Sequence, residues 1–580
     1  MDGRTITRGE RQLRTMGLAR VALGSLLSLA AFFLLLPAAS GAANLEPRLV
    51  QDLNPGPSDS YPYQFTPLGD KLIFSAYGSN GANSWALQGN KATKIIDYSP
   101  GYDSEGAYYY TELGGYLYYE AATAANGGEL WRTNGVTAEQ VSDIWPGEGS
   151  SYPGYFAKLG DFVYFVADTP TSGSEVWKTN GTTTTMVADL NPGVDSSYPG
   201  RLTAFDGKIY FSASTPATGT ELFRTDGNTI ELVMDVNPGA NSSYPEAFTV
   251  AGPNLFFSAS TNTQGTELWK TNGATTAIVS DAYPGNNSSY PGYLEAIGNQ
   301  VVFEATDATH GYELWKSDGT TQSMIADAVP GSNGSNPNNI TTLGNEVFFT
   351  AYEPSTGNEL WRSDLTTVSP VSDIRTGKKS SQPSNLYASD GKIYFAAETA
   401  EQGEELWQAD DSGATLVKDI LPGSEGSDPD NFAPFGDDIY FQANDGTHGY
   451  EMWKLAPPDH VVGVTITGKT FKVSGKGKAT VKVKCLASEL NGPCSGTIAL
   501  ATRKPVKVNG KKRSYKLGKA TKFSVASGKV KGVKVKLTRP LVKLLKTNPP
   551  ARKVKATIKA TDAIGNKATV LKNIKAKVSK

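Results

Sequence analysis

Glutamates that recur at a fixed spacing are the residues of this sequence best suited to acid–base chemistry. One Glu stands two positions before every member but the first of an aromatic series, at Glu129, Glu175, Glu221, Glu267, Glu313, Glu359, Glu405 and Glu451. Acid–base catalysis needs a pair of groups whose pKa values are set apart, and eight equivalent copies contain no special pair. Residues two apart share one face of a β-strand, so we predict a structural Glu beside its own Trp.

Aspartates of a second repeated motif, D-x-x-P-G, offer oxygen ligands of the kind that Ca²⁺ prefers. The motif begins at Asp97, Asp143, Asp189, Asp235, Asp281, Asp327 and Asp419, and at Asp373 with Thr376 in place of Pro. Ca²⁺ takes about six to eight oxygens, and one Asp with nearby Ser and Asn supplies only some of them. We therefore favour an Asx turn that fixes the Pro-Gly loop, and we predict no cofactor, with Ca²⁺ as the alternative.

Tyrosines gather in the loops that follow this motif. The sequence SSYP or a close variant places Tyr152, Tyr198, Tyr244 and Tyr290 at equivalent positions, with Tyr61 in DSYP and with Tyr155 and Tyr293 three residues further on. The corresponding residues of other units are Gly106, Asn336, Gln382 and Asp428. Flat aromatic side chains stack on sugar rings or anchor protein partners, so these seven tyrosines are our candidate ligand-binding residues. The alternative is that each Tyr packs against its own Pro and stiffens the loop.

Residues for other kinds of catalysis are scarce. The chain has three His and two Cys, which disfavours a zinc enzyme or a redox protein. No segment resembles a nucleophile elbow or a metal-binding motif. We predict no catalytic residues, no metal site and no enzymatic activity.

The element that positions these residues is a repeat unit of constant length. Intervals of 46 residues separate the aromatic positions Trp85, Trp131, Trp177, Phe223, Trp269, Trp315, Trp361, Trp407 and Trp453. Within a unit, period-2 alternation and turn signals predict four short strands. The Asn-Gly and Asp-Gly pairs between these strands predict type I′ turns. A Gly four residues before every aromatic residue indicates a backbone geometry that a Cβ would block.

A four-stranded unit of this length is typical of a propeller blade. The chain opens with PRLVQDLNPG, which matches the fourth strand of a unit, and the last unit stops just after Trp453 without a fourth strand. The N-terminal strand can therefore complete the final sheet. We predict an all-β fold, with one propeller of nine blades closed by the N-terminal strand; an open solenoid is the alternative.

The repeated text ELWRTNG (129–135), ELFRTDG (221–227) and ELWKSDG (313–319) resembles the ELWxxDGT repeats of exported bacterial proteins. The resemblance covers residues 44–455 and implies a propeller-like fold without an established reaction. The first unit (NSWALQG) and the last (EMWKLAP) depart from the motif. Such departures are expected of the units that close a ring.

Residues 463–580 form a separate basic domain after a linker at 456–462. Seven or so short alternating strands predict an immunoglobulin-like β-sandwich. The segment ATDAIGNKATV and the many lysines resemble the C-terminal domains of actinobacterial surface proteins. Cys485 and Cys494 flank a turn-like stretch, and we expect them to form a disulfide in an exported domain.

Residues 1–43 resemble a signal peptide. Five arginines precede the apolar run 21–36, and the small residues AASGAA follow Pro37. The run is shorter than the roughly 20 residues of a spanning helix, although an uncleaved anchor is the alternative. No later segment is apolar enough to cross a bilayer. We expect a secreted protein associated with the cell surface.

Charge separates the two domains and indicates the partners. Residues 44–460 carry 19 Lys and Arg against 53 Asp and Glu, a net charge of −34, whereas residues 461–580 carry 31 against two, a net charge of +29. Export removes the usual nucleic-acid targets. We predict a non-enzymatic adhesion or binding protein with an extracellular glycan or protein ligand, whose basic domain associates with an anionic cell-envelope polymer or with its own propeller. The alternatives are a glycan hydrolase or lyase using the propeller cavity, and a structural matrix or coat protein.

Overall fold

The computed structural model describes residues 45–78, 81–96, 108–123, 125–456, 464–486, 493–526, 528–561 and 567–579. The predicted signal peptide, Asp97, Gly106 and all but the first residue of the predicted linker lie outside these ranges. The chain divides into two units, Met1–Leu455 and Ala456–Lys580. Within the described ranges, no helix has the length and apolar character needed to cross a membrane.

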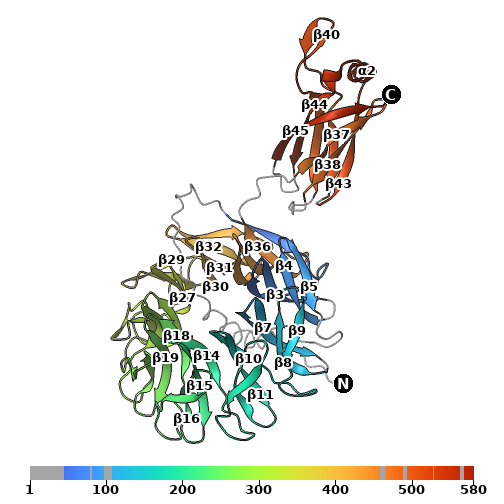
Figure 1. The fold of residues 1–580 in the computed structure, drawn as a ribbon. Helices are drawn as coiled ribbons and strands as arrows, with labels where there is room; N and C mark the ends of the chain where they lie inside the picture. Colours follow the sequence, from blue (N-terminus) through green and yellow to red (C-terminus); the bar gives the residue numbers. More distant parts are fainter. Residues whose placement is uncertain are drawn as a thin grey trace, which may run out of the picture. The chain divides into compact units, whose positions relative to one another are not determined.

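The first unit consists of nine four-stranded antiparallel sheets, which form the blades of a ring (Figure 1). Blades one to three are β2 (Tyr63–Leu68), β3 (Lys71–Gly78), β4 (Gly81–Gln88), β5 (Lys91–Ile96); β6 (Tyr108–Leu113), β7 (Tyr116–Thr123), β8 (Gly127–Thr133), β9 (Ala138–Ser142); and β10 (Gly154–Leu159), β11 (Phe162–Thr169), β12 (Gly173–Thr179), β13 (Thr184–Ala188). Blades four to six are β14 (Gly200–Phe205), β15 (Lys208–Thr215), β16 (Gly219–Thr225), β17 (Ile230–Met234); β18 (Glu246–Ala251), β19 (Asn254–Thr261), β20 (Gly265–Thr271), β21 (Thr276–Ile278); and β22 (Gly292–Ile297), β23 (Gln300–Thr306), β24 (Tyr312–Ser317), β25 (Gln322–Met324). Blades seven to nine are β26 (Asn338–Leu343), β27 (Glu346–Glu353), β28 (Gly357–Ser363), β29 (Val368–Ser372); β30 (Ser384–Ser389), β31 (Lys392–Thr399), β32 (Gly403–Asp410), β33 (Gly413–Lys418); and β34 (Asp430–Phe435), β35 (Asp438–Asn444), β36 (Tyr450–Ala456) with β1 (Glu46–Gln51).

The hydrophobic core lies between neighbouring blades. Tyr164 and Val176 of blade three pack against Phe211 and Phe223 of blade four in one cluster of buried side chains. The first strands of adjacent blades contact one another around the centre of the ring. A single blade would therefore expose its apolar faces, and each blade depends on its neighbours for stability.

The two ends of the repeat region meet in blade nine. Strand β1 lies at the outer edge of the sheet β1-β36-β35-β34. Val50 and Leu53 join a core cluster with Tyr440 and Met452 of blade nine and Phe74 of blade one. The predicted nine-blade propeller closed by the N-terminal strand is confirmed, and the open-solenoid alternative is wrong.

The predicted turn geometry holds in some blades only. Asp206 and Gly207, between β14 and β15, both have positive φ, 45° and 71°, as a type I′ turn requires. Between β12 and β13, the Asn180 side chain accepts hydrogen bonds of 2.9 Å from the backbone N–H groups of Thr182 and Thr183. The type I′ prediction is wrong at this turn, because the Asn side chain caps a turn of residues 180–183.

The repeated Gly before each aromatic residue packs against the following loop. Gly265 has a φ of +64°, and a Cβ at this position would lie 1.9 Å from the carbonyl oxygen of Asn287. Both the backbone conformation and the close approach exclude a side chain. The predicted need for Gly is confirmed here.

The second unit contains β37 (Val464–Val473), β38 (Lys478–Cys485), β39 (Cys494–Thr502), β40 (Val506–Val508), β41 (Lys511–Arg513), β42 (Thr521–Val525), β43 (Val530–Lys536), α2 (Arg539–Thr547), the 3₁₀ helix η1 (Pro549–Arg552), β44 (Lys553–Thr561) and β45 (Lys567–Val578). Seven strands form one sheet in the order β42-β39-β44-β45-β37-β38-β43, and the edge strands β42 and β43 also contact each other. The domain is therefore all-β with a barrel-like sheet. Its resemblance to immunoglobulin-like domains stays a prediction.

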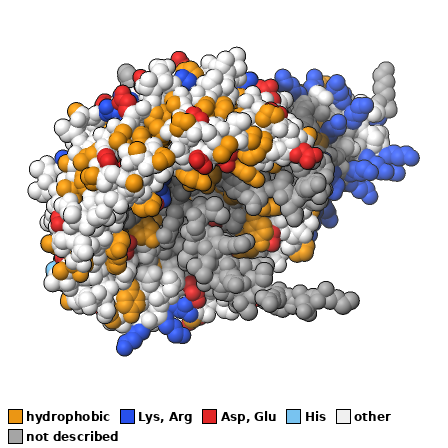
Figure 2. All heavy atoms as spheres, turned by 90° about the horizontal axis from the view of Figure 1, so that it is seen from below, with side chains coloured by type: hydrophobic (Ala, Val, Ile, Leu, Met, Phe, Trp, Pro, Cys, Tyr) orange, Lys and Arg blue, Asp and Glu red, His pale blue; other side chains and the backbone are white. Residues whose placement is uncertain are grey.

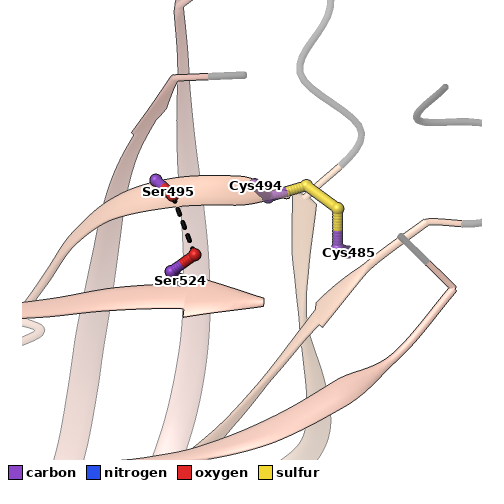
Figure 3. The surroundings of a disulfide bond; sticks show 4 residues. All are labelled: Cys485, Cys494, Ser495 and Ser524. Carbon is purple, nitrogen blue, oxygen red and sulfur yellow. Dashed lines mark hydrogen bonds between the residues drawn. A yellow bond between two sulfur atoms is a disulfide. The ribbon is translucent and has the colours of Figure 1, made fainter. Parts of the chain in front are cut away.

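A disulfide joins the end of β38 to the start of β39 (Figure 3). The Cα atoms of Cys485 and Cys494 are 5.7 Å apart, and both side chains are fully buried. Beside it, the hydroxyl groups of Ser495 and Ser524 form a hydrogen bond of 3.0 Å between β39 and β42 (Figure 3). The predicted disulfide is confirmed.

Candidate functional site

The candidate site is built on the loops that lead from the last strand of one blade to the first strand of the next. The loop between β9 and β10 is held by the carboxylate of Glu129 on β8. This carboxylate accepts hydrogen bonds from the backbone N–H of Ile144 (2.8 Å), the backbone N–H of Trp145 (3.2 Å) and the hydroxyl of Ser151 (2.7 Å). A single buried side chain thus fixes both ends of the loop.

The same arrangement recurs in every blade that carries the motif. The partner serines are Ser151, Ser197, Ser243, Ser289, Ser335, Ser381 and Ser427, and Ser60 serves Glu451. All eight glutamates have no exposed surface. Burial raises the pKa of each of them and outweighs the hydrogen bonds that they accept. These carboxylates anchor loops, and the predicted pairing with Trp is wrong because loop N–H groups and a serine hydroxyl occupy them.

The aspartates of the D-x-x-P-G motif stabilise the same loops from within. One carboxylate oxygen of Asp235 accepts a hydrogen bond of 3.0 Å from the backbone N–H of Gly239, and Asp281 and Asp373 bond Gly285 and Gly377 in the same way. These bonds reach four residues along the chain rather than the two of an Asx turn, so the aspartates fix the Pro-Gly loop by a longer local bond. In the described part of the chain, no three His, Cys, Asp or Glu residues come together as a metal site. Calcium binding stays an untested alternative.

Four tyrosines that follow the anchored serines project from consecutive loops, and we call them the tyrosine row. Tyr152, Tyr198, Tyr244 and Tyr290 are 63%, 73%, 62% and 56% exposed. Their φ angles are 44°, 48°, 49° and 47°. The left-handed region costs most residues roughly 1–2 kcal/mol, whereas Asn and Asp tolerate it. The equivalent Asn336, Gln382 and Asp428 have φ angles of 49°, 51° and 45°, so the loop adopts the left-handed conformation whichever residue occupies the position. Packing of each Tyr against its own Pro stays the alternative to ligand binding.

The tyrosine row has small neighbours on one side. The residue before the buried Glu of the preceding blade is Gly128, Ser174, Thr220 or Thr266. The backbone N–H groups of Tyr152, Tyr244 and Tyr290 donate hydrogen bonds of 3.2 Å to the carbonyls of these neighbours, which are Gly128, Thr220 and Thr266 respectively. In the blades without the Tyr, the equivalent neighbours are the larger Tyr312, Asn358 and Glu404. Small neighbours therefore accompany the exposed rings.

Polar residues flank the row on the other side. The serine carbonyls before the four tyrosines accept backbone hydrogen bonds of 2.8, 2.7, 2.8 and 2.9 Å from Asp168, Ser214, Ser260 and Thr306. These residues end the second strand of the following blade. The following blade therefore also holds each loop, through a backbone bond to the serine that precedes the Tyr.

The remaining candidate tyrosines differ from the row. Tyr155 is 47% exposed with a φ of 53°, and Tyr293, with a φ of 51°, is more buried. Both lie in bulges of the innermost strands β10 and β22. Tyr61 stacks on Tyr450 with ring centroids 5.0 Å apart. Tyr155 therefore extends the exposed surface, whereas Tyr61 belongs to the contact between the two ends of the ring.

One group of carboxyls in blades eight and nine was not singled out from the sequence. Burial, together with the charges of Asp428 and Asp430, raises the pKa of Glu404 to about 7, while the Ser384 hydroxyl bonds it at 3.3 Å. Tyr450 donates a hydrogen bond to Asp428. The sequence feature that could have indicated this group is the pair of adjacent acids Glu404 and Glu405 in GEELW. Other units have a small or neutral residue before the repeated Glu.

Comparison with known proteins supports a propeller built from repeats. A family model described as outer membrane protein assembly factor BamB matches residues 298–446, about a quarter of the chain. No curated protein matches the sequence significantly.

Several solved structures share a low overall similarity with the chain. The β-propeller domain of the Trilobed protease from Pyrococcus furiosus is 10% identical, with a TM-score of 0.31, covering 62% of this chain and 98% of that one. A GH74 xyloglucanase from Xanthomonas campestris is 12% identical, with a TM-score of 0.30, covering 91% and 93%. A puromycin-hydrolyzing peptidase from Mycobacterium tuberculosis is 10% identical, with a TM-score of 0.33, covering 62% and 61%. Similarities at this level assign no activity, and the chain is a β-propeller repeat protein.

Proposed function

We propose that this protein is an exported, non-enzymatic binding protein, and that its ring binds a glycan of repeating units along the tyrosine row. The observation that carries the proposal is the conformation of the row. Four exposed tyrosines occupy left-handed positions that Asn336, Gln382 and Asp428 fill in other blades. Exposed aromatic rings held at a conformational cost point to a ligand rather than to stability.

The chemistry around each ring favours a sugar. An aromatic face packs against the apolar face of a pyranose, while nearby polar groups bind its hydroxyls. Asp168, Ser214, Ser260 and Thr306, whose backbone N–H groups bond the serines that precede the row, carry polar side chains of this kind. Because the four positions are equivalent, a chain of similar units can engage several blades at once, and weak contacts then combine.

An exported location is part of the same proposal. The disulfide in the second unit is a bond that persists in oxidising compartments. The predicted signal peptide would deliver the chain to such a compartment. N-terminal sequencing of the protein from its native host would show whether residues 1–43 are removed.

The test is binding of the full mature chain to a glycan array, compared with a variant in which all four row tyrosines become Asn. If each ring contributes about 0.5–1.5 kcal/mol, the variant should bind at least about thirtyfold more weakly. A control variant changes the exposed Val136, Leu232 and Val250 to Asn and should bind like the parent. Equal binding by the parent and the tyrosine variant would contradict the proposal, and capture of proteins but no glycans would replace the sugar with a protein ligand.

The enzyme alternative would depend on Glu404. Its pKa of about 7 is suited to a general acid, and Asp428 and Asp430 carry charges nearby. The structure also has an open cavity of about 500 Å³, but its lining at the turns of blades one and nine includes only Asp70 as an ionisable residue among those described. A panel of glycan substrates tests this alternative: turnover by the parent that is lost in Glu404→Gln would establish an enzyme.

A further inference from the structure

Exposed lysines cover neighbouring strands of the C-terminal sheet. Strands β38 and β43 alternate strictly between buried apolar and outward residues over 479–483 and 533–536, and most outward positions are Lys. The same alternation continues across β37 and β45. We define the lysine face as Lys472, Lys478, Lys482, Lys534, Lys536, Lys575 and Lys577.

The strand register places some of these charges directly opposite one another. Lys478 pairs with Lys536 between β38 and β43, and Lys472 pairs with Lys577 between β37 and β45. Like charges in directly opposed positions destabilise a sheet. Within the described residues of this unit, no ion pair relieves the repulsion.

The charge is unevenly distributed around the sheet. The outward residues of β39, which are Ser495, Thr497, Ala499 and Ala501, carry no charge. In the space-filling view, Lys and Arg side chains crowd one part of the molecule and are sparse on the rest of the visible surface (Figure 2). Lys553, Lys555 and Lys559 on β44 continue the exposed lysines, which thus lie on five adjacent strands, β44-β45-β37-β38-β43. A requirement for solubility alone would not place so many lysines side by side.

The choice of Lys also restricts the ligand. Of the 31 basic residues in 461–580, 27 are Lys and 4 are Arg. Lys acts as a flexible point charge, whereas Arg favours fixed bidentate contacts with a single phosphate or carboxylate. Phe471 and Phe523 are buried, so they provide no platform on which the bases of a single-stranded nucleic acid could stack.

We infer that the lysine face binds a linear anionic polymer of the cell envelope that carries a phosphate or carboxylate on each repeating unit. Alternate residues on a strand are about 6.8 Å apart and neighbouring strands about 4.8 Å apart, so the lysines form a lattice of positive charge. A flexible polyanion can follow such a lattice in many registers. This inference is independent of the tyrosine row and adds a second binding surface to the proposed function.

The experiment uses the full mature chain and two probes, long-chain polyphosphate and polygalacturonate, across a salt series from about 50 to about 500 mM. A variant changes Lys472, Lys478, Lys482, Lys534 and Lys536 to Gln. Each lost contact should reduce the slope of log K against log salt by up to about 0.7, and the five together by up to about 3.5. Preference for one probe distinguishes a phosphate polymer from a carboxylate polymer.

A matched control removes five charges elsewhere in the same unit, at Lys507, Lys511 and Lys512 near the β40–β41 hairpin and at Lys543 and Lys546 on α2. It should retain most of the binding and melt like the parent, whereas the lysine-face variant should melt at the same or a higher temperature because it removes opposed charges. Three results would overturn the inference: an equal loss of polymer binding in the lysine-face variant and the control, no binding of either polymer by the parent, or tighter binding of duplex DNA than of both polymers. The tyrosine-row variant should bind both polymers normally, which separates this result from the glycan test.

Discussion

The carboxylate of Glu451 accepts a hydrogen bond of 2.8 Å from the backbone N–H of Leu53, which lies 398 positions earlier in the chain. The same carboxylate bonds the Ser60 hydroxyl at 2.8 Å. In the seven other blades that carry the Glu, it binds a loop that follows it in the sequence. Here it joins the two ends of the ring, beside the pairing of β1 with β36.

Replacing Glu451 with Ala should weaken the closure selectively. The change leaves buried N–H and O–H donors without an acceptor, at a cost of about 3 kcal/mol. The backbone amides of β1 should then exchange with solvent about a hundredfold faster, as measured by hydrogen–deuterium exchange.

Glu267→Ala is the matched control for this variant. Glu267 makes the equivalent contacts to Ala282 and Ser289, but the chain itself continues through that blade junction. The control should speed exchange in its own loop and leave β1 unchanged. Equal protection of β1 in Glu451→Ala and the parent would contradict the role assigned to this contact.

The ring should be more stable at pH 5 than at pH 8. Burial raises the pKa of Glu451 to about 7, above its usual 4.5, and the nearby charge of Asp52 adds to the effect. The folded state thus holds the proton more tightly, so the stabilisation is complete below pH 4.5 and is lost as the pH rises through 7. At about 1.4 kcal/mol per pKa unit, Glu451 contributes at most about 3 kcal/mol.

Thermal unfolding at both pH values measures this dependence. His310 and His448 also have raised pKa values, because each bonds its own Asp, and they act in the same direction. Glu451→Gln separates the contributions, since it should show a flatter pH profile than the parent. Greater stability at pH 8 than at pH 5 would exclude the proposed protonation.

Exchanging Tyr and Asn between equivalent loops should change stability in opposite directions. Tyr198 and Asn336 have nearly the same φ, 48° and 49°. Tyr198→Asn should raise the free energy of unfolding by about 1 kcal/mol, and Asn336→Tyr should lower it by a similar amount. Melting curves of the two variants provide the measurement. If Tyr198→Asn is the less stable protein, the Tyr braces its loop and is not held there for a ligand.

Two glycines of one blade allow steric and conformational effects to be compared. Gly265→Ala should cost about 3 kcal/mol or more, because its Cβ would overlap the carbonyl oxygen of Asn287. Gly285 has a φ of +91°, but a Cβ there would have no atom within 4 Å. Gly285→Ala should therefore cost only about 1–2 kcal/mol. Similar losses in the two variants would show that φ alone accounts for the repeated glycine.

By itself, the sequence determined the ring. The interval of 46 residues, the strand pattern within each unit and the match between PRLVQDLNPG and a fourth strand are local features that repeat. Each repeat buries its apolar faces only against the next, so the pattern also specifies how units stack. The register of the units and the missing last strand then leave closure by β1 as the consistent arrangement.

The tertiary structure decided what the repeated side chains do. Glu129 was predicted beside Trp131, but Ser151, 22 positions further along the chain, takes its carboxylate. The left-handed backbone of Tyr198 and the charges that raise the pKa of Glu404 were also unavailable from residue spacing. Strand periodicity records only which side of a strand a residue faces. Hydrogen-bond partners, φ angles and local electric fields depend on segments that meet only after the blades have assembled.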